Sequence, residues 1–133
     1  MFAVNPSRSD LEGVPCVSSI EELPVAPDAV YLAIPASDVV GAVRSLSDMG
    51  AGGVVCFSAG FKEAGNNQTE LDLIEATGNM ALIGPNCYGF INYLDKVSVW
   101  SDQISGETSK KGIAFICQSG TIGNTISFNN RSL

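Results

Sequence analysis

The stretch GPNCYG (84–89) follows the short apolar run 80–83 and is the most informative part of the chain. Two other polar, glycine-containing turns, SAGFKE (58–63) and QSGT (118–121), each follow an apolar run of their own. Strands that alternate with helices in this way indicate an α/β fold with a parallel sheet. Because ligands of open parallel sheets bind beyond the carboxyl ends of the strands, we expect the three turns to form one ligand-binding rim.

The apolar pattern predicts the remaining elements. Strands are expected at 2–4, 28–34, 53–57, 80–83, 97–100 and 113–116, with an edge-like segment at 13–17 and a helical turn at 19–23. The run 28–34 is continuous, as in a strand that is buried on both faces. A first helix is expected to be capped by Ser37 or Asp38 and to end at Gly50. A second helix spans 69–77, with Leu71 and Ile74, and as a further candidate Leu73, on its core side, and a third spans 121–128.

Composition limits the classes of function. The 133 residues are 45% hydrophobic, which is enough for about one packed domain. The net charge is −7 and the seven basic residues are scattered, so a nucleic-acid partner is not expected. The apolar runs are too short for a membrane span, and no signal-peptide pattern precedes Asn5. We therefore expect a cytoplasmic protein without a membrane partner.

Several kinds of site are disfavoured by the residues themselves. The chain has no histidine and no CxxC pair, which argues against a metal site and against a Ser/His/Asp or Cys/His centre. It has no GxGxxG fingerprint, so a nicotinamide-binding Rossmann protein is disfavoured. Gly60 and Gly65 have Walker spacing, but Asn66 and Asn67 replace the required Lys-Ser/Thr. Among the cysteines, Cys56 and Cys117 are expected to be small buried hydrophobes, whereas Cys87 lies in a turn.

The turn QSGT (118–121) allows two interpretations. Gly120 permits close approach of the backbone, and the hydroxyls of Ser119 and Thr121, with free N–H groups at the start of a helix, would make an anion cradle. An ordinary N-cap, where Ser and Thr are common, explains the same residues. The residues alone leave both open.

In order and spacing, five segments resemble the CoA-binding region of the NDP-forming acyl-CoA synthetase family, whose members include the α subunit of succinyl-CoA synthetase and ADP-forming acetyl-CoA synthetase. The segments are VNP (4–6), YLAIPA (31–36), SAGFKE (58–63), GPNCYG (84–89) and QSG (118–120). The resemblance implies a Rossmann-like parallel sheet over residues 1–107, followed over 108–133 by the first βα unit of a flavodoxin-like domain.

The same resemblance implies a site and a reaction. It assigns eight residues to the lining of the CoA site: Asn5, Pro6, Ile34, Pro35, Ser58, Ala59, Asn86 and Cys87. Ser119, Gly120 and Thr121 would receive a phosphate. In the family, an acid, CoA and a nucleoside triphosphate give acyl-CoA through an acyl phosphate and a phosphohistidine.

Some parts of the family pattern have no counterpart in the chain. The first strand with its glycine-rich phosphate loop, the phosphorylated histidine and the nucleotide-grasp portion, where ATP or ADP with Mg would bind, are not in these residues. We therefore expect an incomplete piece of an acid–CoA ligase, inactive alone, whose partners are CoA or acyl-CoA and the missing domains or subunit. The alternative is a regulatory CoA-sensing module of an acetyltransferase-type fusion. No residue pattern identifies the acyl substrate.

Overall fold

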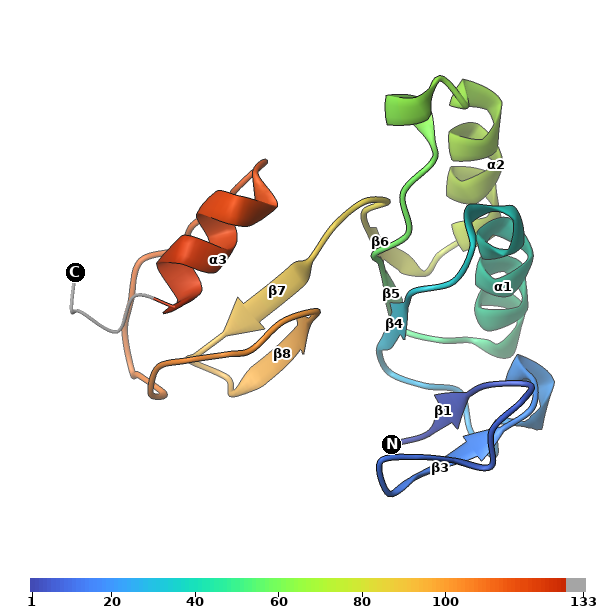
Figure 1. Cartoon of the computed structure of the whole chain (residues 1–133), viewed down its shortest axis with the longest axis horizontal. Helices are drawn as coiled ribbons and strands as arrows, with labels where there is room; N and C mark the ends of the chain where they lie inside the picture. Colours follow the sequence, from blue (N-terminus) through green and yellow to red (C-terminus); the bar gives the residue numbers. More distant parts are fainter. Residues whose placement is uncertain (129–133) are drawn as a thin grey trace.

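The computed structural model describes residues 1–128, whose strands form three small sheets (Figure 1). The first sheet has the order β1-β3-β2 and contains β1 (Ala3–Val4), β2 (Asp10–Leu11) and β3 (Val14–Val17). The second is parallel throughout, in the order β4-β5-β6, with β4 (Val30–Leu32), β5 (Gly53–Cys56) and β6 (Ala81–Ile83). The third is an antiparallel hairpin of β7 (Gly89–Asn92) and β8 (Val97–Trp100).

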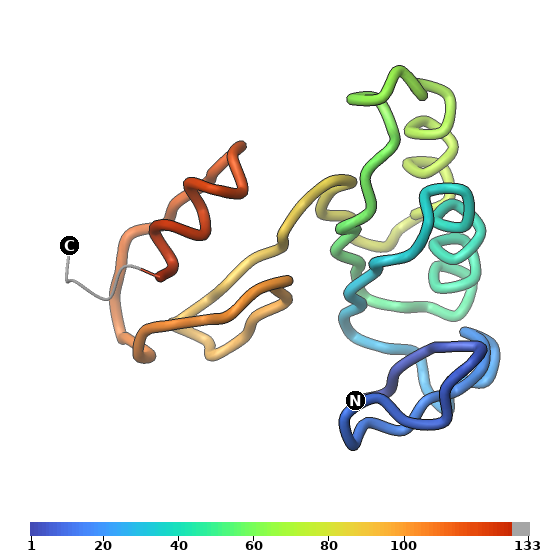
Figure 2. The backbone as a smooth tube through the Cα atoms, in the orientation of Figure 1, coloured from blue at the N-terminus to red at the C-terminus, as the bar shows by residue number. Residues whose placement is uncertain are grey.

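The helices divide the molecule into two lobes. The helices are α1 (Ala36–Met49), α2 (Asn67–Thr77) and α3 (Gly120–Phe128), with two 3-10 turns, η1 (Ile20–Glu22) and η2 (Lys62–Ala64). α1 and α2 lie side by side on one face of the β4-β5-β6 sheet, and we call this the helix-covered lobe (Figure 1). α3 lies beside the β7-β8 hairpin, in what we call the hairpin lobe. The backbone crosses between them once, in the segment that leads into β7 (Figure 2).

The core lies between the parallel sheet and its two helices. Leu32, Val54 and Cys56 point from the strands towards α1 and α2 and belong to one buried cluster. α1 contributes Val39 and Val43 to the same cluster, and both are fully buried. Within the described residues, every buried hydrophobic residue lies between positions 32 and 80. The helix-covered lobe therefore holds the whole of the closed core.

The first helix begins slightly earlier than its sequence predicts. α1 starts at Ala36 with Pro35 as N-cap residue, so the prediction of a Ser37 or Asp38 cap is wrong. Pro35 suits this position because its fixed φ is compatible with a helix start, and its carbonyl accepts the N–H of Asp38 at 2.9 Å. The predicted end is confirmed, since Gly50 adopts the left-handed conformation at φ 88°.

The second helix presents a different face from the predicted one. Leu73 is fully buried, together with Ala76, but Leu71 and Ile74 are 59% and 55% exposed. The small Ala76 side chain lets α2 approach α1, and the Ser47 hydroxyl on α1 donates to the Thr77 carbonyl at 2.9 Å. Helix-to-helix packing therefore selected the face with the smaller side chain and turned Leu71 and Ile74 outward.

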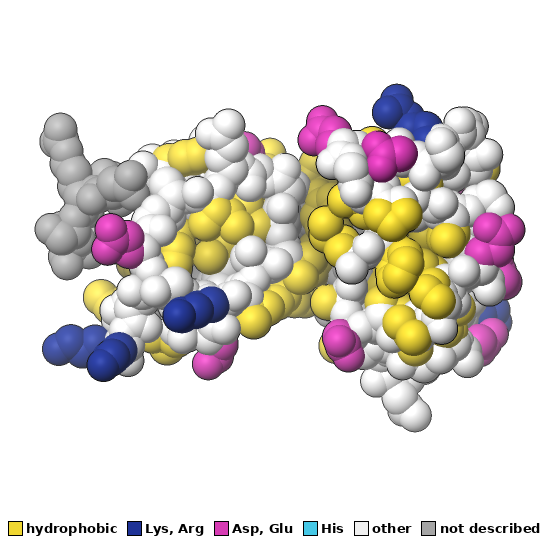
Figure 3. Space-filling view, turned by 90° about the horizontal axis from the view of Figure 1, so that it is seen from below, with side chains coloured by type: hydrophobic (Ala, Val, Ile, Leu, Met, Phe, Trp, Pro, Cys, Tyr) yellow, Lys and Arg dark blue, Asp and Glu magenta, His cyan; other side chains and the backbone are white. Residues whose placement is uncertain are grey.

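The parallel sheet is closed on one face only. Tyr31, Val55 and Ile83 are directly paired across the three strands and lie on the face away from the helices. Val55 is buried, but Tyr31 and Ile83 are 38% and 37% exposed. The prediction that the 28–34 strand is buried on both faces is therefore wrong, because both α1 and α2 cover the same side. Hydrophobic side chains are also gathered on the underside of both lobes (Figure 3).

The carboxyl-terminal part differs most from the prediction. The run 113–116 forms no strand, and Ile113 and Ile116 are 76% and 101% exposed. A strand needs a neighbour for its N–H and C=O groups, and no described segment pairs with this one. The predicted helix is confirmed as α3. It packs beside the segment that follows β8, where the Ser105 hydroxyl donates to the Ser127 carbonyl. Residues 129–133 of the predicted second domain lie outside the described residues.

Candidate functional site

A single side chain ties together the carboxyl ends of two neighbouring strands. Ser58, just beyond β5, is 7% exposed and donates its hydroxyl to the Ile34 carbonyl, just beyond β4, at 2.6 Å. The same oxygen accepts the Ile34 N–H at 3.2 Å. These two hydrogen bonds fix the backbone just before Pro35, the N-cap residue of α1. Two of the predicted pairs, Ile34-Pro35 and Ser58-Ala59, are thus parts of one structure.

The turn beyond β6 joins the same structure through its backbone. The Asn86 N–H donates to the Ser58 carbonyl at 3.0 Å, and the Cys87 N–H donates to the Cys56 carbonyl at 3.2 Å. Gly84, at φ 107°, lies so close to β5 that a Cβ atom there would overlap the Cys56 carbonyl oxygen. Asn86 has φ 55° and an exposed side chain. The ends of β4, β5 and β6 therefore form a continuous rim, with the Asn86 amide available to a ligand.

The turn that follows Ser58 is held by groups of its own. Glu63 accepts the Gly60 N–H at 2.6 Å and the Phe61 N–H at 3.3 Å. The Gly60 hydrogen bond in particular lowers the pKa of the Glu63 carboxyl. Phe61 is fully buried in the core, and the Asn66 amide donates to the Gly60 carbonyl at 2.7 Å. The buried Phe61 ring and the hydrogen bonds to Glu63 thus hold the backbone of this turn in place.

Asn5 and Pro6 lie on a different sheet from the other predicted CoA residues. The Asn5 N–H donates to the Val17 carbonyl at 2.9 Å, and the Asn5 side chain accepts the Ser7 N–H at 2.9 Å. No hydrogen bond in the described residues connects this turn to the rim at Ser58. Asn5 stabilises its own turn, and its predicted contact with CoA remains a prediction.

The turn at the start of α3 has the geometry of a capped helix with free donors. The Ser119 hydroxyl accepts the Ile122 N–H at 3.4 Å, and the Ser119 carbonyl accepts the Gly123 N–H at 3.0 Å. In the described part of the chain, the N–H groups of Gly120 and Thr121 have no hydrogen-bond partner. Helix N-termini of this kind attract anions through free donors and partial positive charge. Both interpretations of this turn are therefore compatible with the geometry.

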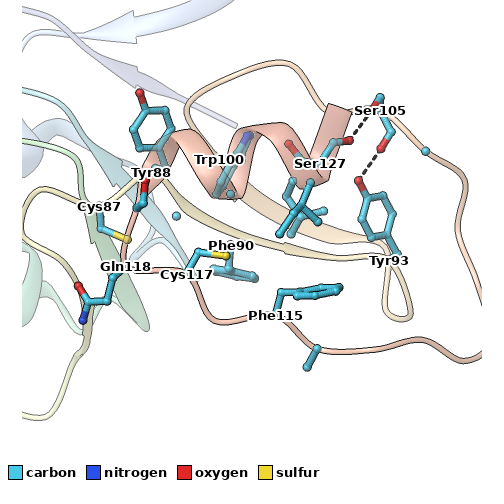
Figure 4. Close-up of a pocket in the computed structure, with 18 of the residues that line it drawn as sticks. Cys87, Tyr88, Phe90, Tyr93, Trp100, Ser105, Phe115, Cys117, Gln118 and Ser127 are labelled. Carbon is cyan, nitrogen blue, oxygen red and sulfur yellow. Dashed lines mark hydrogen bonds between the residues drawn. The ribbon is translucent and has the colours of Figure 1, made fainter. Parts of the chain in front are cut away.

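A cavity of about 580 Å³ lies between the turn beyond β6 and the turn before α3 (Figure 4). Asn86 and Cys87 line it from one side, and Ser119 and Gly120 from the other. The ring of Tyr88, which belongs to the first of these turns, lies against the second: a Cβ atom on Gly120 would lie 2.6 Å from its Cε2 atom. Ile34, Pro35, Ser58 and Ala59 are not among the lining residues. The structure thus places Ile34, Pro35, Ser58 and Ala59 at the rim and Ser119 and Gly120 at the cavity, and Asn86 and Cys87 belong to both. Asn5, Pro6 and Thr121 are not part of this arrangement.

A row of aromatic rings in contact with one another runs from the helix-covered lobe to the hairpin lobe. Tyr31 and Phe57 have centroids 5.9 Å apart, Phe57 and Tyr88 are 5.7 Å apart with edge-to-face geometry, and Trp100 follows Tyr88 at 5.7 Å. These four residues are outside the site predicted from the sequence. The density of aromatics just after GPNC, at positions 88, 90 and 93, is the signal that could have pointed to them.

The cysteines differ in environment. Cys56 is fully buried, and burial raises the pKa of its thiol, so it is a core residue as predicted. Cys117 is exposed and lines the cavity, so the prediction that it is buried is wrong. The reason is that the run before it forms no strand. The described residues contain no cluster of three or more potential metal ligands.

Comparison with known proteins identifies the family to which these features belong. The CoA binding domain family matches residues 1–93. The chain belongs to this family. It is 38% identical over 129 residues to trans-feruloyl-CoA synthase FCS1 from an unknown prokaryotic organism, covering 92% of the chain and 18% of that protein. It is 35% identical over 124 residues to acetate–CoA ligase [ADP-forming] I from Archaeoglobus fulgidus, covering 90% and 18%.

A solved structure extends the likeness to both lobes. The dinucleotide forming acetyl-coenzyme A synthetase 1 of Ca. Korarchaeum cryptofilum, in complex with phosphate and ADP, aligns with a TM-score of 0.80 and 27% identity. The alignment covers 95% of this chain and 27% of that one. The chain spans less than a third of the length of each of these proteins. The predicted α/β class and the resemblance to NDP-forming acyl-CoA synthetases are confirmed, and nothing in the comparisons supports the acetyltransferase fusion.

Proposed function

We propose that this CoA-binding domain supplies the CoA and phosphate sites of an NDP-forming acid–CoA ligase. The reaction of the whole protein would join a carboxylic acid to CoA at the expense of a nucleoside triphosphate, through an acyl phosphate. The observation that carries the proposal is the hydrogen-bonded rim of Ile34, Ser58 and Asn86, in which Asn86 lines the same cavity as Ser119 and Gly120.

The rim would bind CoA through its backbone and small side chains. Pro35 and Ala59 are exposed beside the buried Ser58, and the exposed Asn86 amide offers both a donor and an acceptor. The pantetheine arm would then run past Asn86 and Cys87 into the cavity. On this proposal the eight predicted residues contribute unequally, and Asn5 and Pro6 contribute only if CoA also reaches the first sheet.

The turn at Ser119, Gly120 and Thr121 would hold the phosphate that is transferred. Its free N–H groups and the partial positive charge of the α3 N-terminus favour an anion. Nothing in this chain can carry a phosphoryl group on histidine, because the sequence contains none. The phosphohistidine, with ATP or ADP and Mg, would come from other domains or another subunit. The relatives act by name on acids as different as acetate and ferulate, so their names leave the acyl group open.

The chain itself can be tested for CoA binding by NMR. Titration with CoA should shift the backbone amide signals of residues 34–35, 58–60 and 86–87. Ser58→Ala removes both hydrogen bonds to Ile34 and should weaken binding about tenfold. Ser98→Ala, on the exposed surface of β8, is the matched control and should leave binding unchanged. Absence of any shift at millimolar CoA, or shifts away from the rim, would overturn the proposal.

A second measurement tests whether the phosphoryl-carrying step needs a part of the protein outside this chain. The chain alone, supplied with an acid, CoA and ATP, should form no acyl-CoA above a control without protein, since no histidine is present to carry the phosphoryl group. Product formation by the purified chain would contradict this part of the proposal.

A further inference from the structure

The cavity next to the rim is lined by aromatic side chains that have no role in the proposed CoA and phosphate sites. Five aromatic residues contribute to its lining: Tyr88, Phe90, Tyr93, Trp100 and Phe115 (Figure 4). CoA would reach the cavity with its thiol end, at Cys87, and the phosphate would lie at Ser119. The carbonyl carbon of an acyl phosphate would lie between the thiol that attacks it and the phosphate that leaves, and the remainder of the acyl group would extend from that carbon into the cavity. The aromatic walls therefore surround the place where that group would lie.

The rings are held in place by neighbours within the lobe. The Tyr93 hydroxyl donates to the Ser105 carbonyl, which positions its ring at the far end of the cavity (Figure 4). The Trp100 ring packs on Tyr88 and lies under α3, where a Cβ atom on Gly123 would be 3.6 Å from its Cη2 atom. Phe90 is 37% exposed and Phe115 is 52% exposed, so both keep apolar surface that a ligand can cover.

Charge restricts the class of ligand further. Among the described residues that line the cavity, Glu107 is the only charged one, and none is Lys or Arg. A second carboxylate would therefore find no cation to pair with and would be repelled by Glu107. The volume of about 580 Å³ is within the range of pockets that enclose drug-sized ligands, and a two-carbon acyl group would leave most of it to water.

We infer that the acid substrate is a monocarboxylic acid with an uncharged aromatic acyl group, which the cavity encloses while CoA lies on the rim. This rests on the proposed function and names its substrate class. Flat rings gain offset or edge-to-face contacts with Phe90, Trp100 and Phe115 in addition to burial of apolar surface. An aliphatic acyl chain would gain only the free energy of burying apolar surface. For a dicarboxylic acid, the cost of burying an unpaired carboxylate beside Glu107 would exceed that gain.

The test compares four ligands on the same chain by NMR titration: CoA, acetyl-CoA, succinyl-CoA and cinnamoyl-CoA. Cinnamoyl-CoA should bind at least about tenfold more tightly than acetyl-CoA, and succinyl-CoA no more tightly than CoA. The chain has a single tryptophan, so one indole N–H signal reports on the cavity. It should move with cinnamoyl-CoA and stay in place with CoA.

A variant with a larger side chain inside the cavity provides a second test of the same inference. Gly123→Leu places a side chain between Trp100 and Cys117, and it should reduce the preference for cinnamoyl-CoA to below about twofold while CoA binding persists. Gly41→Leu is the matched control, because a Cβ added to this helical glycine would have no neighbouring atom within 4 Å, and it should keep the preference. CoA binding without any preference for cinnamoyl-CoA overturns the inference and leaves the proposed function standing. Absence of CoA binding overturns both.

Discussion

The two lobes use their apolar residues in opposite ways. In the helix-covered lobe, Val39, Val43 and Phe61 are completely buried. In the hairpin lobe no described residue is fully enclosed, and Phe115 and Ile122 are 52% and 56% exposed. The first lobe can therefore hold its rim rigid by packing, whereas the second positions its cavity walls through a few hydrogen bonds and ring contacts. On the proposed function, CoA binding would depend on a stable core, and acyl specificity would depend on a surface that is less tightly packed.

The largest expected effect is the loss of a core ring. Phe61→Ala removes a fully buried side chain and should lower the free energy of unfolding by about 3–5 kcal/mol. Phe115→Ala, on the exposed surface of the hairpin lobe, should cost less than about 1 kcal/mol. Urea unfolding followed by circular dichroism measures both. Equal losses would contradict the contrast between the lobes.

The next effect concerns the close approach of Gly84 to β5. Gly84→Ala forces a methyl group onto the Cys56 carbonyl and should destabilise the chain by about 2 kcal/mol more than Gly13→Ala. Gly13 is the matched control because it also has positive φ, but a Cβ added there would have no neighbouring atom within 4 Å. The difference between the two unfolding midpoints isolates the clash. CoA binding should weaken in Gly84→Ala alone, because only this substitution displaces Asn86 from Ser58.

A smaller effect should remain within the hairpin lobe. Gly120→Ala places a Cβ atom 2.6 Å from the Tyr88 ring, so the ring or the start of α3 must shift. The emission of Trp100, which packs on Tyr88, should move to longer wavelength while the unfolding midpoint changes little. Gly41→Ala, in an open position of α1, should leave the emission unchanged and raise stability by up to about 1 kcal/mol. Unaltered Trp100 emission in Gly120→Ala would show that the two turns are not in contact.

The smallest effect is a pH dependence of the turn at Gly60. The pKa of Glu63 is lowered by hydrogen bonds from the backbone, so its contribution to stability is complete above its ordinary pKa of 4.5 and is lost as pH falls through the lowered value. Titration of the carboxyl carbon by NMR should give a midpoint below 4.5. Glu63→Gln should remove this part of the acid dependence. A midpoint at or above 4.5 would contradict the observed hydrogen bonds.

Local sequence was sufficient for most of the helix-covered lobe. The short apolar runs at β4, β5 and β6 predicted the parallel strands, and Gly50 predicted the end of α1, because both signals act over a few residues. Two of the three predicted turns, 58–63 and 84–89, do follow neighbouring strands of the parallel sheet, whose ends meet at one edge. The third, 118–121, follows no strand, so the prediction that it belongs to the same rim of strand ends is wrong. For α2 the candidate Leu73 is confirmed as a core residue, whereas Leu71 and Ile74 were predicted there wrongly. Leu71 and Leu73 are equally apolar, and only the fit against α1 chooses between them.

The sequence by itself thus determined the α/β class, the three strand ends and the family, because periodicity, turn residues and motif order are properties of short segments. Only the tertiary structure decided three other features. Among the described residues the run 113–116 has no strand partner, the Tyr88 ring lies against Gly120, and five aromatic rings line one cavity. The physical reason is the same in each case: pairing and enclosure are made by residues far apart in the chain, and no local pattern specifies which distant segment will be the neighbour.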